Sequence, residues 1–150
     1  MNADLEMSVT GDYEKLVPFF IANELEFSED EPVPTDLVRC WQVLRREDGA
    51  LVGAVVLARR EGEFIIDGIA VDASLRGTGV GREMLAAALA ETARRGGRSL
   101  YLVARAPGFF ARSGFTAIPR EEAPNFFECF TCPQYGSSCH PQVMRREVQA

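Results

Sequence analysis

The chain has 150 residues, of which 47% are apolar and 25% charged, which is the balance of one ordinary soluble globular domain. Its formal net charge of −6 argues against nucleic acid as a partner, because a phosphate backbone requires a basic surface. No apolar stretch approaches the ~20 residues of a membrane-spanning helix, so no membrane partner is expected.

The N-terminal segment is expected to hold a short strand and one helix. Leu5 to Val9 form the strand, and Thr10 or Asp12 provides an N-cap for a helix from Tyr13 to Asn23. The first 15 residues lack the basic and apolar regions of a signal peptide, which predicts a cytoplasmic protein with reduced cysteines.

An acidic segment broken by two prolines follows, from Glu24 to Asp36. Such a charge run is usually a solvated loop. Its alternative interpretation is the rim of a substrate pocket that favours a cationic group. Leu37 to Cys40 are then expected to form a short helical turn.

Three antiparallel strands are predicted next, joined by two tight turns. Asp48-Gly49 separates a strand at Trp41–Arg46 from one at Leu51–Arg59, and Asp-Gly between β-rich runs is a strong hairpin signal. Glu61-Gly62 turns the chain into a third, apolar strand from Phe64 to Val71.

The stretch after this strand has the features of a phosphate-binding loop. Residues 76–81 read Arg-Gly-Thr-Gly-Val-Gly and run directly into a helical pattern. A glycine-rich strand-to-helix junction directs main-chain N–H groups and the positive end of the helix dipole at one point. The residues after Gly81 are Arg82-Glu83, which excludes a nucleotide-triphosphate loop, and no glycine register fits a dinucleotide fingerprint. A glycine turn without any ligand remains the alternative.

The remaining elements are a helix, a strand, a short helix and a strand. They are expected at Gly81–Arg95, Ser99–Val103, Pro107–Ser113 and Phe115–Ile118, with Gly96-Gly97 and Gly114 ending the two helices. The part from Phe126 to Val148 has a less regular pattern. No linker divides the chain, so a single α/β (α+β) domain over residues 1–150 is expected, with a cysteine-containing tail at about 126–150.

Three motifs together resemble the GNAT family of N-acetyltransferases over roughly residues 5 to 120. The family signature [Q/R]-x-x-G-x-[G/A] is matched by Arg76-x-x-Gly79-x-Gly81. Ile69-Ala70-Val71-Asp72 is similar to the family's fourth strand, and Ala106-x-x-Phe109-Phe110-x-x-x-Gly114-Phe115 to its A-x-x-F-Y-x-x-x-G-F segment. The resemblance implies a mixed, mostly antiparallel sheet flanked by helices, with acetyl-CoA as cosubstrate.

The resemblance also implies which residues hold the coenzyme. Main-chain N–H groups of the loop would bind the pyrophosphate, and the strand before it would pair with the pantetheine arm. Gly68 is a plausible residue for the β-bulge at which family members splay two strands. The predicted coenzyme-binding residues are Ile69, Ala70, Val71, Arg76, Gly77, Thr78, Gly79, Val80, Gly81, Arg82 and Phe110.

The proton chemistry departs from the family pattern. Family members often carry a glutamate base where this chain has Ile65, and a tyrosine acid where it has Phe110. Asp67 is the first candidate for the base and Glu63 the second, since a carboxylate is the usual base for this attack. Asp67 is equally compatible with a structural role as a strand-edge or bulge carboxylate. Phe110 is interpreted as a wall against the pantetheine or the core.

The cysteine-containing tail permits two interpretations. Cys129, Cys132 and Cys139 have side chains suited to zinc, but one C-x-x-C pair beside a Cys-His dipeptide is a weak metal signal. Reduced cysteines that pack on the domain are favoured, and no metal is expected. The spacing Cys129-x-x-Cys132-Pro133, followed by Cys139 and Met144, is similar to short bacterial N-acetylglutamate synthase-like acetyltransferases.

The predicted function is therefore acetyl transfer from acetyl-CoA to a small primary amine. The tail favours the α-amino group of glutamate or another amino acid, whereas the acidic segment favours a polyamine or a protein amine. The loss of the family's tyrosine and glutamate leaves a non-catalytic acyl-CoA-binding sensor as a further alternative. A homodimer is compatible with the sequence.

Overall fold

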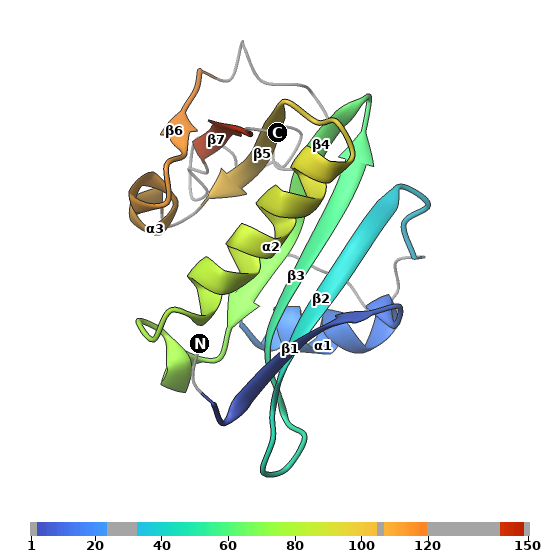
Figure 1. Ribbon diagram of the computed structural model, residues 1–150, viewed down its shortest axis with the longest axis vertical. Helices are drawn as coiled ribbons and strands as arrows, with labels where there is room; N and C mark the ends of the chain where they lie inside the picture. The colour runs from blue at the N-terminus through green and yellow to red at the C-terminus, as the bar shows by residue number, and fades with distance from the viewer. Residues whose placement is uncertain (1–2, 24–32, 105–106, 120–141, 149–150) are drawn as a thin grey trace.

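A computed structural model describes residues 3–23, 33–104, 107–119 and 142–148 of the chain (Figure 1). These residues form one seven-stranded sheet with helices on both of its faces. The elements in chain order are β1 Leu5–Thr10, α1 Tyr13–Ala22, β2 Leu37–Arg45, β3 Leu51–Arg60, β4 Glu63–Val71, the 3₁₀ turn η1 Ala73–Leu75, α2 Val80–Arg94, β5 Ser99–Ala104, α3 Pro107–Arg112, β6 Thr116–Ala117 and β7 Gln142–Glu147.

The strand order is β1-β2-β3-β4-β5-β7-β6. Every neighbouring pair is antiparallel except β4 and β5, which run parallel and are joined by the crossover helix α2. A parallel pair cannot be joined by a tight turn, which is why the helix is placed between these two strands. The prediction of a mixed, mostly antiparallel sheet flanked by helices is confirmed.

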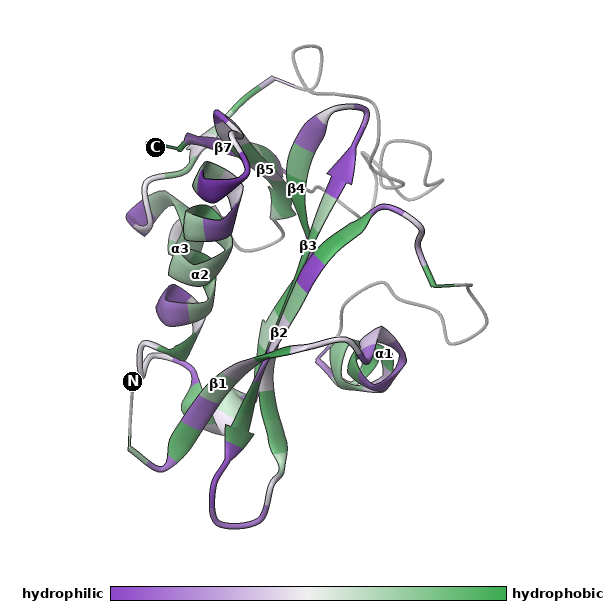
Figure 2. Ribbon diagram, turned by 45° about the vertical axis from the view of Figure 1, so that its right-hand side comes forward, coloured by the Kyte–Doolittle hydropathy of each residue, from purple (hydrophilic) through white to green (hydrophobic). Residues whose placement is uncertain are grey.

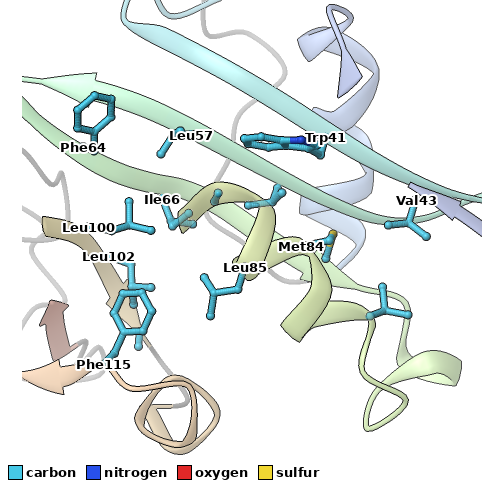
Figure 3. Close-up of a cluster of buried hydrophobic side chains, with 14 of the residues drawn as sticks. Trp41, Val43, Leu57, Phe64, Ile66, Met84, Leu85, Leu100, Leu102 and Phe115 are labelled. Carbon is cyan, nitrogen blue, oxygen red and sulfur yellow. The ribbon is translucent and has the colours of Figure 1, made fainter. Parts of the chain in front are cut away.

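Helices α1 and α2 cover opposite faces of the sheet, and α3 lies on the α2 side (Figure 2). The larger core fills the space between the sheet and α2 and includes Trp41, Met84 and Phe115 (Figure 3). A second core lies under α1, whose Leu16 and Phe20 are fully buried. Among the residues that the structure describes, no helix is long and apolar enough to cross a membrane.

The expected helical turn at Leu37–Cys40 was wrong, because these residues are the first part of β2. Leu37 lies opposite Ala58 on β3, and Cys40 pairs with both Thr10 on β1 and Val56 on β3. Pairing with β3, and at Cys40 also with β1, provides partners for main-chain groups of the segment. This tertiary pairing overrides a local preference that four residues can express only weakly.

The expected irregularity of the C-terminal part was wrong for its last residues. Gln142 to Glu147 form β7, which lies between β5 and β6 and pairs with both. Only Val143 and Met144 of this strand are buried, so its sequence lacks the regular alternation that indicates a strand. Residues 120–141, which include Cys129, Cys132 and Cys139, lie outside the described residues.

A buried carboxylate ties α2 to the sheet. Glu91 of α2 is only 6% exposed and contacts three arginines: Arg39 on β2 at 3.3 Å, Arg95 at 2.6 Å and Arg94. Hydrogen bonds from Arg94 first, then from Arg95 and the charge of Arg39, lower the pKa of Glu91 from 4.5 to about 2. This charge cluster fixes the C-terminal end of α2 over β2.

Replacing Glu91 with glutamine is expected to destabilise the protein by about 1–2 kcal/mol at pH 7, because one buried anion that binds three cations is lost. The folded-state pKa is depressed, so this stabilisation is present above pH 4.5 and is lost as the pH falls towards 2. Urea unfolding of both proteins at several pH values should therefore show stability curves that converge below pH 4.5. Glu47→Gln, at an exposed turn position, serves as the control and should show no such convergence. A pH-independent gap between the two curves would contradict the assignment.

Candidate functional site

Strand β4 carries a bulge in its middle. Gly68 lies opposite Val56 on β3, but Ile66 already lies opposite the next residue, Leu57, so Asp67 has no counterpart in the register. The alternation of the strand changes there: Phe64 and Ile66 face the α2 core, and after the bulge Ile69 and Val71 do so. The bulge thus lies next to the predicted Gly68, and Asp67 is the extra residue.

The sheet opens directly after this point. Strands β4 and β5 are paired only at Phe64 with Leu100 and at Ile65 with Tyr101. Beyond Ile65 the two strands diverge, so within the described residues the edge of β4 from 66 to 71 has no strand beside it on the β5 side. The predicted pantetheine-contacting residues Ile69, Ala70 and Val71 all lie on this open edge, where an extended ligand finds unpaired main-chain groups.

The glycine loop closes the same end of β4. Gly77 and Gly79 have φ angles of +83° and +95°, which the absence of a Cβ permits at little cost. Gly79 is the N-cap of α2 and offers no side-chain cap to the helix. A Cβ placed on either glycine would meet no atom within 4 Å, so open space lies above both.

The loop presents a group of N–H donors that nothing in the described part of the chain uses. Within the described residues, no acceptor receives a hydrogen bond from the main-chain N–H groups of Gly77, Gly79, Val80, Gly81 or Arg82. The N-terminal end of α2 adds the positive end of the helix dipole. Open space above converging N–H donors at a helix N-terminus suits a phosphate.

The third glycine of the motif has a packing role. A Cβ on Gly81 would lie 3.1 Å from the ring of Phe109 on α3 and 3.6 Å from Val71, so α3 packs closely against the start of α2. Phe109 and Phe110 meet edge to face at 5.0 Å, and Phe110 meets Phe115 at 6.0 Å. Phe110 therefore belongs to an aromatic cluster beside the loop, and its contact with pantetheine stays a prediction.

The side chain of Arg76 points away from the loop. Its Nε donates to the carbonyl oxygen of Val71 at 3.3 Å, and its Nη2 donates to Oδ1 of Asn23 at 3.4 Å. Asn23 is the C-cap of α1. In this arrangement Arg76 joins the end of β4 to α1, and only its main chain belongs to the loop.

The bulge residue Asp67 is part of a chain of charges on the α1 face. Arg60 of β3 donates to Asp36 through Nε at 2.6 Å and through Nη2 at 3.4 Å, and the same Nη2 lies 3.5 Å from Oδ1 of Asp67. The three side chains are between 21% and 27% exposed, so the group is accessible to a ligand. The hydrogen bond that Arg60 donates to Asp36 and the charges of both carboxylates raise the pKa of Arg60.

Cys40 lies close to Asp67 on the same face. Burial raises the pKa of its thiol to about 11, and the Asp67 carboxylate adds to this rise. Cys40 is therefore a neutral, free thiol in the second core.

The two predicted base candidates occupy different places on β4. Asp67 lies past the last β4–β5 pair, at the opening of the sheet. Glu63 lies before that pair, opposite Arg60, about 13 Å along the strand from Asp67 at ~3.3 Å per residue. Only Asp67 is therefore next to the open edge.

Two cavities lie along the outer side of α2, away from the opening of the sheet. The first, of about 400 Å³, lies between α2 and the end of α3, and the second, of about 550 Å³, continues it towards β7. Arg82, next to the glycine loop, and Arg112 of α3 both line the first. The described residues hold no group of three His, Cys, Asp or Glu side chains that is suited to a metal ion.

Sequence reasoning found the loop and Asp67, but it did not identify the partners of Asp67. No sequence motif includes Arg60, and Asp36 was read only as the end of an acidic segment. They are separated by 24 residues in the chain, and no spacing signal connects them. The pairing of β2 with β3 brings them together.

The acetyltransferase (GNAT) family model matches residues 12–115 of the chain. No curated protein matches the sequence.

Solved structures of acetyltransferases have the same fold as this chain at low sequence identity. A GNAT-family acetyltransferase from Staphylococcus aureus Mu50 has a TM-score of 0.75 at 16% identity, over 97% of this chain and 99% of that one. The N-acetylglutamate synthase of Neisseria gonorrhoeae, complexed with coenzyme A and N-acetyl-glutamate, has a TM-score of 0.78 at 18% identity, over 100% of this chain and 36% of that one. The ribosomal-protein-S18-alanine N-acetyltransferase of Escherichia coli has a TM-score of 0.69 at 17% identity, over 97% of this chain and 95% of that one.

Proposed function

The chain belongs to the acetyltransferase (GNAT) family, and from this premise we propose that it transfers the acetyl group of acetyl-CoA to a small primary amine through the opening between β4 and β5. The observation that carries the proposal is the unused group of N–H donors from Gly77 to Arg82, which lies at the end of the open β4 edge. A pyrophosphate on the donors and a pantetheine arm along the edge would direct the thioester towards the bulge.

The proposed reaction is a direct attack. The amine nitrogen forms a bond to the acetyl carbonyl carbon, the C–S bond breaks, and the sulfur leaves with the electron pair. A main-chain N–H near Ile69 or Val71 would stabilise the oxyanion, a contribution worth about 3–4 kcal/mol in acyl transfer elsewhere. This chemistry requires no metal, and any zinc at Cys129, Cys132 and Cys139 would be structural.

Asp67 is the proposed base, with Glu63 as the second candidate. Asp67 lies at the opening of the sheet, and its ion pair with Arg60 requires the carboxylate form, which is able to accept the proton of the attacking amine. The tyrosine that serves many relatives as an acid is Phe110 here. A thiol with an ordinary pKa near ~8.5 is a tolerable leaving group without such an acid.

Glutamate remains the first proposed acceptor, and the N-acetylglutamate synthase neighbour supports it only as a similar fold. A second observation favours an amine without a carboxylate. Arg60, the arginine of the Asp67 charge chain, already binds two carboxylates, so it is not available to clamp an acidic substrate. A polyamine or a protein amine is therefore the second candidate.

The proposal is tested by release of free thiol from acetyl-CoA in the presence of single acceptors: glutamate, other amino acids, spermidine and a peptide with a free N-terminus. We expect turnover with at least one of them, and the ranking of glutamate against spermidine identifies the acceptor class. Tight binding of CoA without turnover of any amine would support the sensor alternative instead.

The arginines beside the loop suit the third phosphate of CoA. Arg82 and Arg112 both line the cavity beside the loop, where the 3′-phosphate of the adenosine would be near opposite charge. The double replacement Arg82→Ala, Arg112→Ala is expected to weaken CoA by about tenfold, as one charge-assisted contact is worth about 1.5–3 kcal/mol before solvent screening. Calorimetry should show that the same double replacement changes the affinity for 3′-dephospho-CoA only slightly. Arg145→Ala, which lines the more distant cavity, is the control, and equal losses for both coenzymes would contradict the assignment.

A further inference from the structure

The guanidinium of Arg60 lies between two carboxylates, those of Asp36 and Asp67. Asp36 binds it at two points, Nε at 2.6 Å and Nη2 at 3.4 Å. A two-point contact fixes the plane of a guanidinium as well as its position. The Nη2 that Asp36 shares is thereby directed towards the bulge, where it meets Oδ1 of Asp67 at 3.5 Å.

A bulge residue requires such a support. Asp67 has no counterpart on β3, so the β3–β4 register does not fix it as it fixes its neighbours. The contact from Arg60 comes from a strand that is paired along its whole length, and Asp36 is itself anchored, because its carbonyl oxygen accepts from the N–H of Arg59 at 3.0 Å. The chain of charges thus ties the bulge of β4 to the end of β3 and to the residue before β2.

We propose that Arg60 is a positioning residue of the transfer reaction: with Asp36 as its anchor, it orients the Asp67 carboxylate at the opening of the sheet and keeps it ionised as the base. This inference rests on the proposed function. Arg60 touches neither the thioester nor the amine in this scheme and acts only through Asp67.

Titratable groups from several elements lie on the same face as Asp67. The Cys40 thiol of β2 stays neutral because its pKa is raised to about 11. The other titratable side chains on this face include Asp36 before β2, Glu63 on β4, Tyr101 on β5, Arg145 on β7 and Tyr13 on α1. Arg60 Nη2 lies 3.5 Å from Oδ1 of Asp67, so removal of Arg60 takes away this positive charge while the like charge of Asp36 stays.

The expected consequence is a change in the pH dependence of turnover. An opposite charge within 4–6 Å favours the ionised carboxylate, and its loss favours the protonated one. The pH dependence of kcat reports the pKa values of groups in the enzyme–substrate complex. In Arg60→Met, the fall of kcat on the acid side of this profile (its acid limb) should move to higher pH by about one unit. Turnover then falls by up to about tenfold at pH values below both pKa values of the carboxylate, and the loss disappears well above them.

The experiment compares kcat from pH 3.5 to 9 with one saturating acceptor for four proteins: the wild type, Arg60→Met, Arg60→Lys and Arg59→Met. Arg59 is the matched control, since it is the neighbouring arginine on the same strand and lies over the Phe64 ring, 5.1 Å from its centroid. Arg59→Met removes the same charge and should leave the acid limb in place. Arg60→Lys keeps the charge but cannot bridge two carboxylates, so its limb should lie between those of the wild type and Arg60→Met.

A pH-independent fall in kcat for Arg60→Met would show a merely structural role and would overturn the inference, as would equal shifts for Arg59→Met and Arg60→Met. If Arg60→Met does not fold, an acid limb of Arg60→Lys that coincides with that of the wild type also overturns it, and an intermediate limb supports it. Absence of turnover in the wild type would refute the proposed function instead, so the two failures are distinguishable.

Discussion

Replacement of Gly79 with valine is expected to weaken binding of CoA by ~100-fold or more. Gly79 is the N-cap of α2 with φ at +95°, a conformation that a β-branched residue does not adopt without strain. The side chain would also occupy the open space that the donors surround. Loss of two charge-assisted hydrogen bonds, worth about 1.5–3 kcal/mol each, accounts for this factor at 1.4 kcal/mol per tenfold.

The control for this variant is Gly49→Val, which separates backbone strain from ligand binding. Gly49 lies in the β2–β3 turn with φ at +72° and open space around its Cβ position, so it resembles Gly79 in conformation but not in location. Both variants should lose stability by about 1–3 kcal/mol. Calorimetric titration with CoA should find the affinity unchanged in Gly49→Val. Wild-type affinity in Gly79→Val would refute the assignment of the loop to the pyrophosphate.

Replacement of Asp67 with asparagine is expected to lower kcat by ~100-fold or more while CoA affinity stays within about twofold. A positioned general base contributes about 10²–10⁴-fold, and asparagine retains the shape of the side chain without its basicity. Asp67 lies at the opening of the sheet, on the face opposite to α2, so it does not touch the proposed pyrophosphate loop. Steady-state kinetics with the acceptor found in the thiol-release assay, combined with calorimetry for CoA, measures the two effects separately.

Glu63→Gln is the informative companion to this variant. If the hundredfold loss appears in Glu63→Gln and not in Asp67→Asn, the base is the second candidate and the role of the bulge is structural. The position of Glu63 before the closed β4–β5 pair leads us to expect the larger loss in Asp67→Asn. Comparable, small losses in both variants would indicate that the amine reaches the site already deprotonated.

The sequence predicted secondary structure accurately where neighbouring residues determine it, and less accurately where pairing with distant strands does. The Asp-Gly turn, the strand of residues 64–71 and the α2 boundaries were predicted closely, because turn residues, hydrophobic runs and glycine stops act within a few residues. The start of β2 at Leu37 and the whole of β7 were missed, because only pairing with distant strands makes these segments extended. The roles of the predicted coenzyme-binding residues stay predictions.

The sequence by itself determined the glycine turn at residues 76–82 and its free N–H donors, since glycines at a helix start admit the positive φ that this turn requires. Only the tertiary structure decided the arrangement of the acceptor side. The register of β3 against β4 makes Asp67 the bulge residue, and the pairing of β2 with β3 brings Asp36 to Arg60. Such contacts depend on strand register between segments far apart in the chain, and no local pattern encodes them.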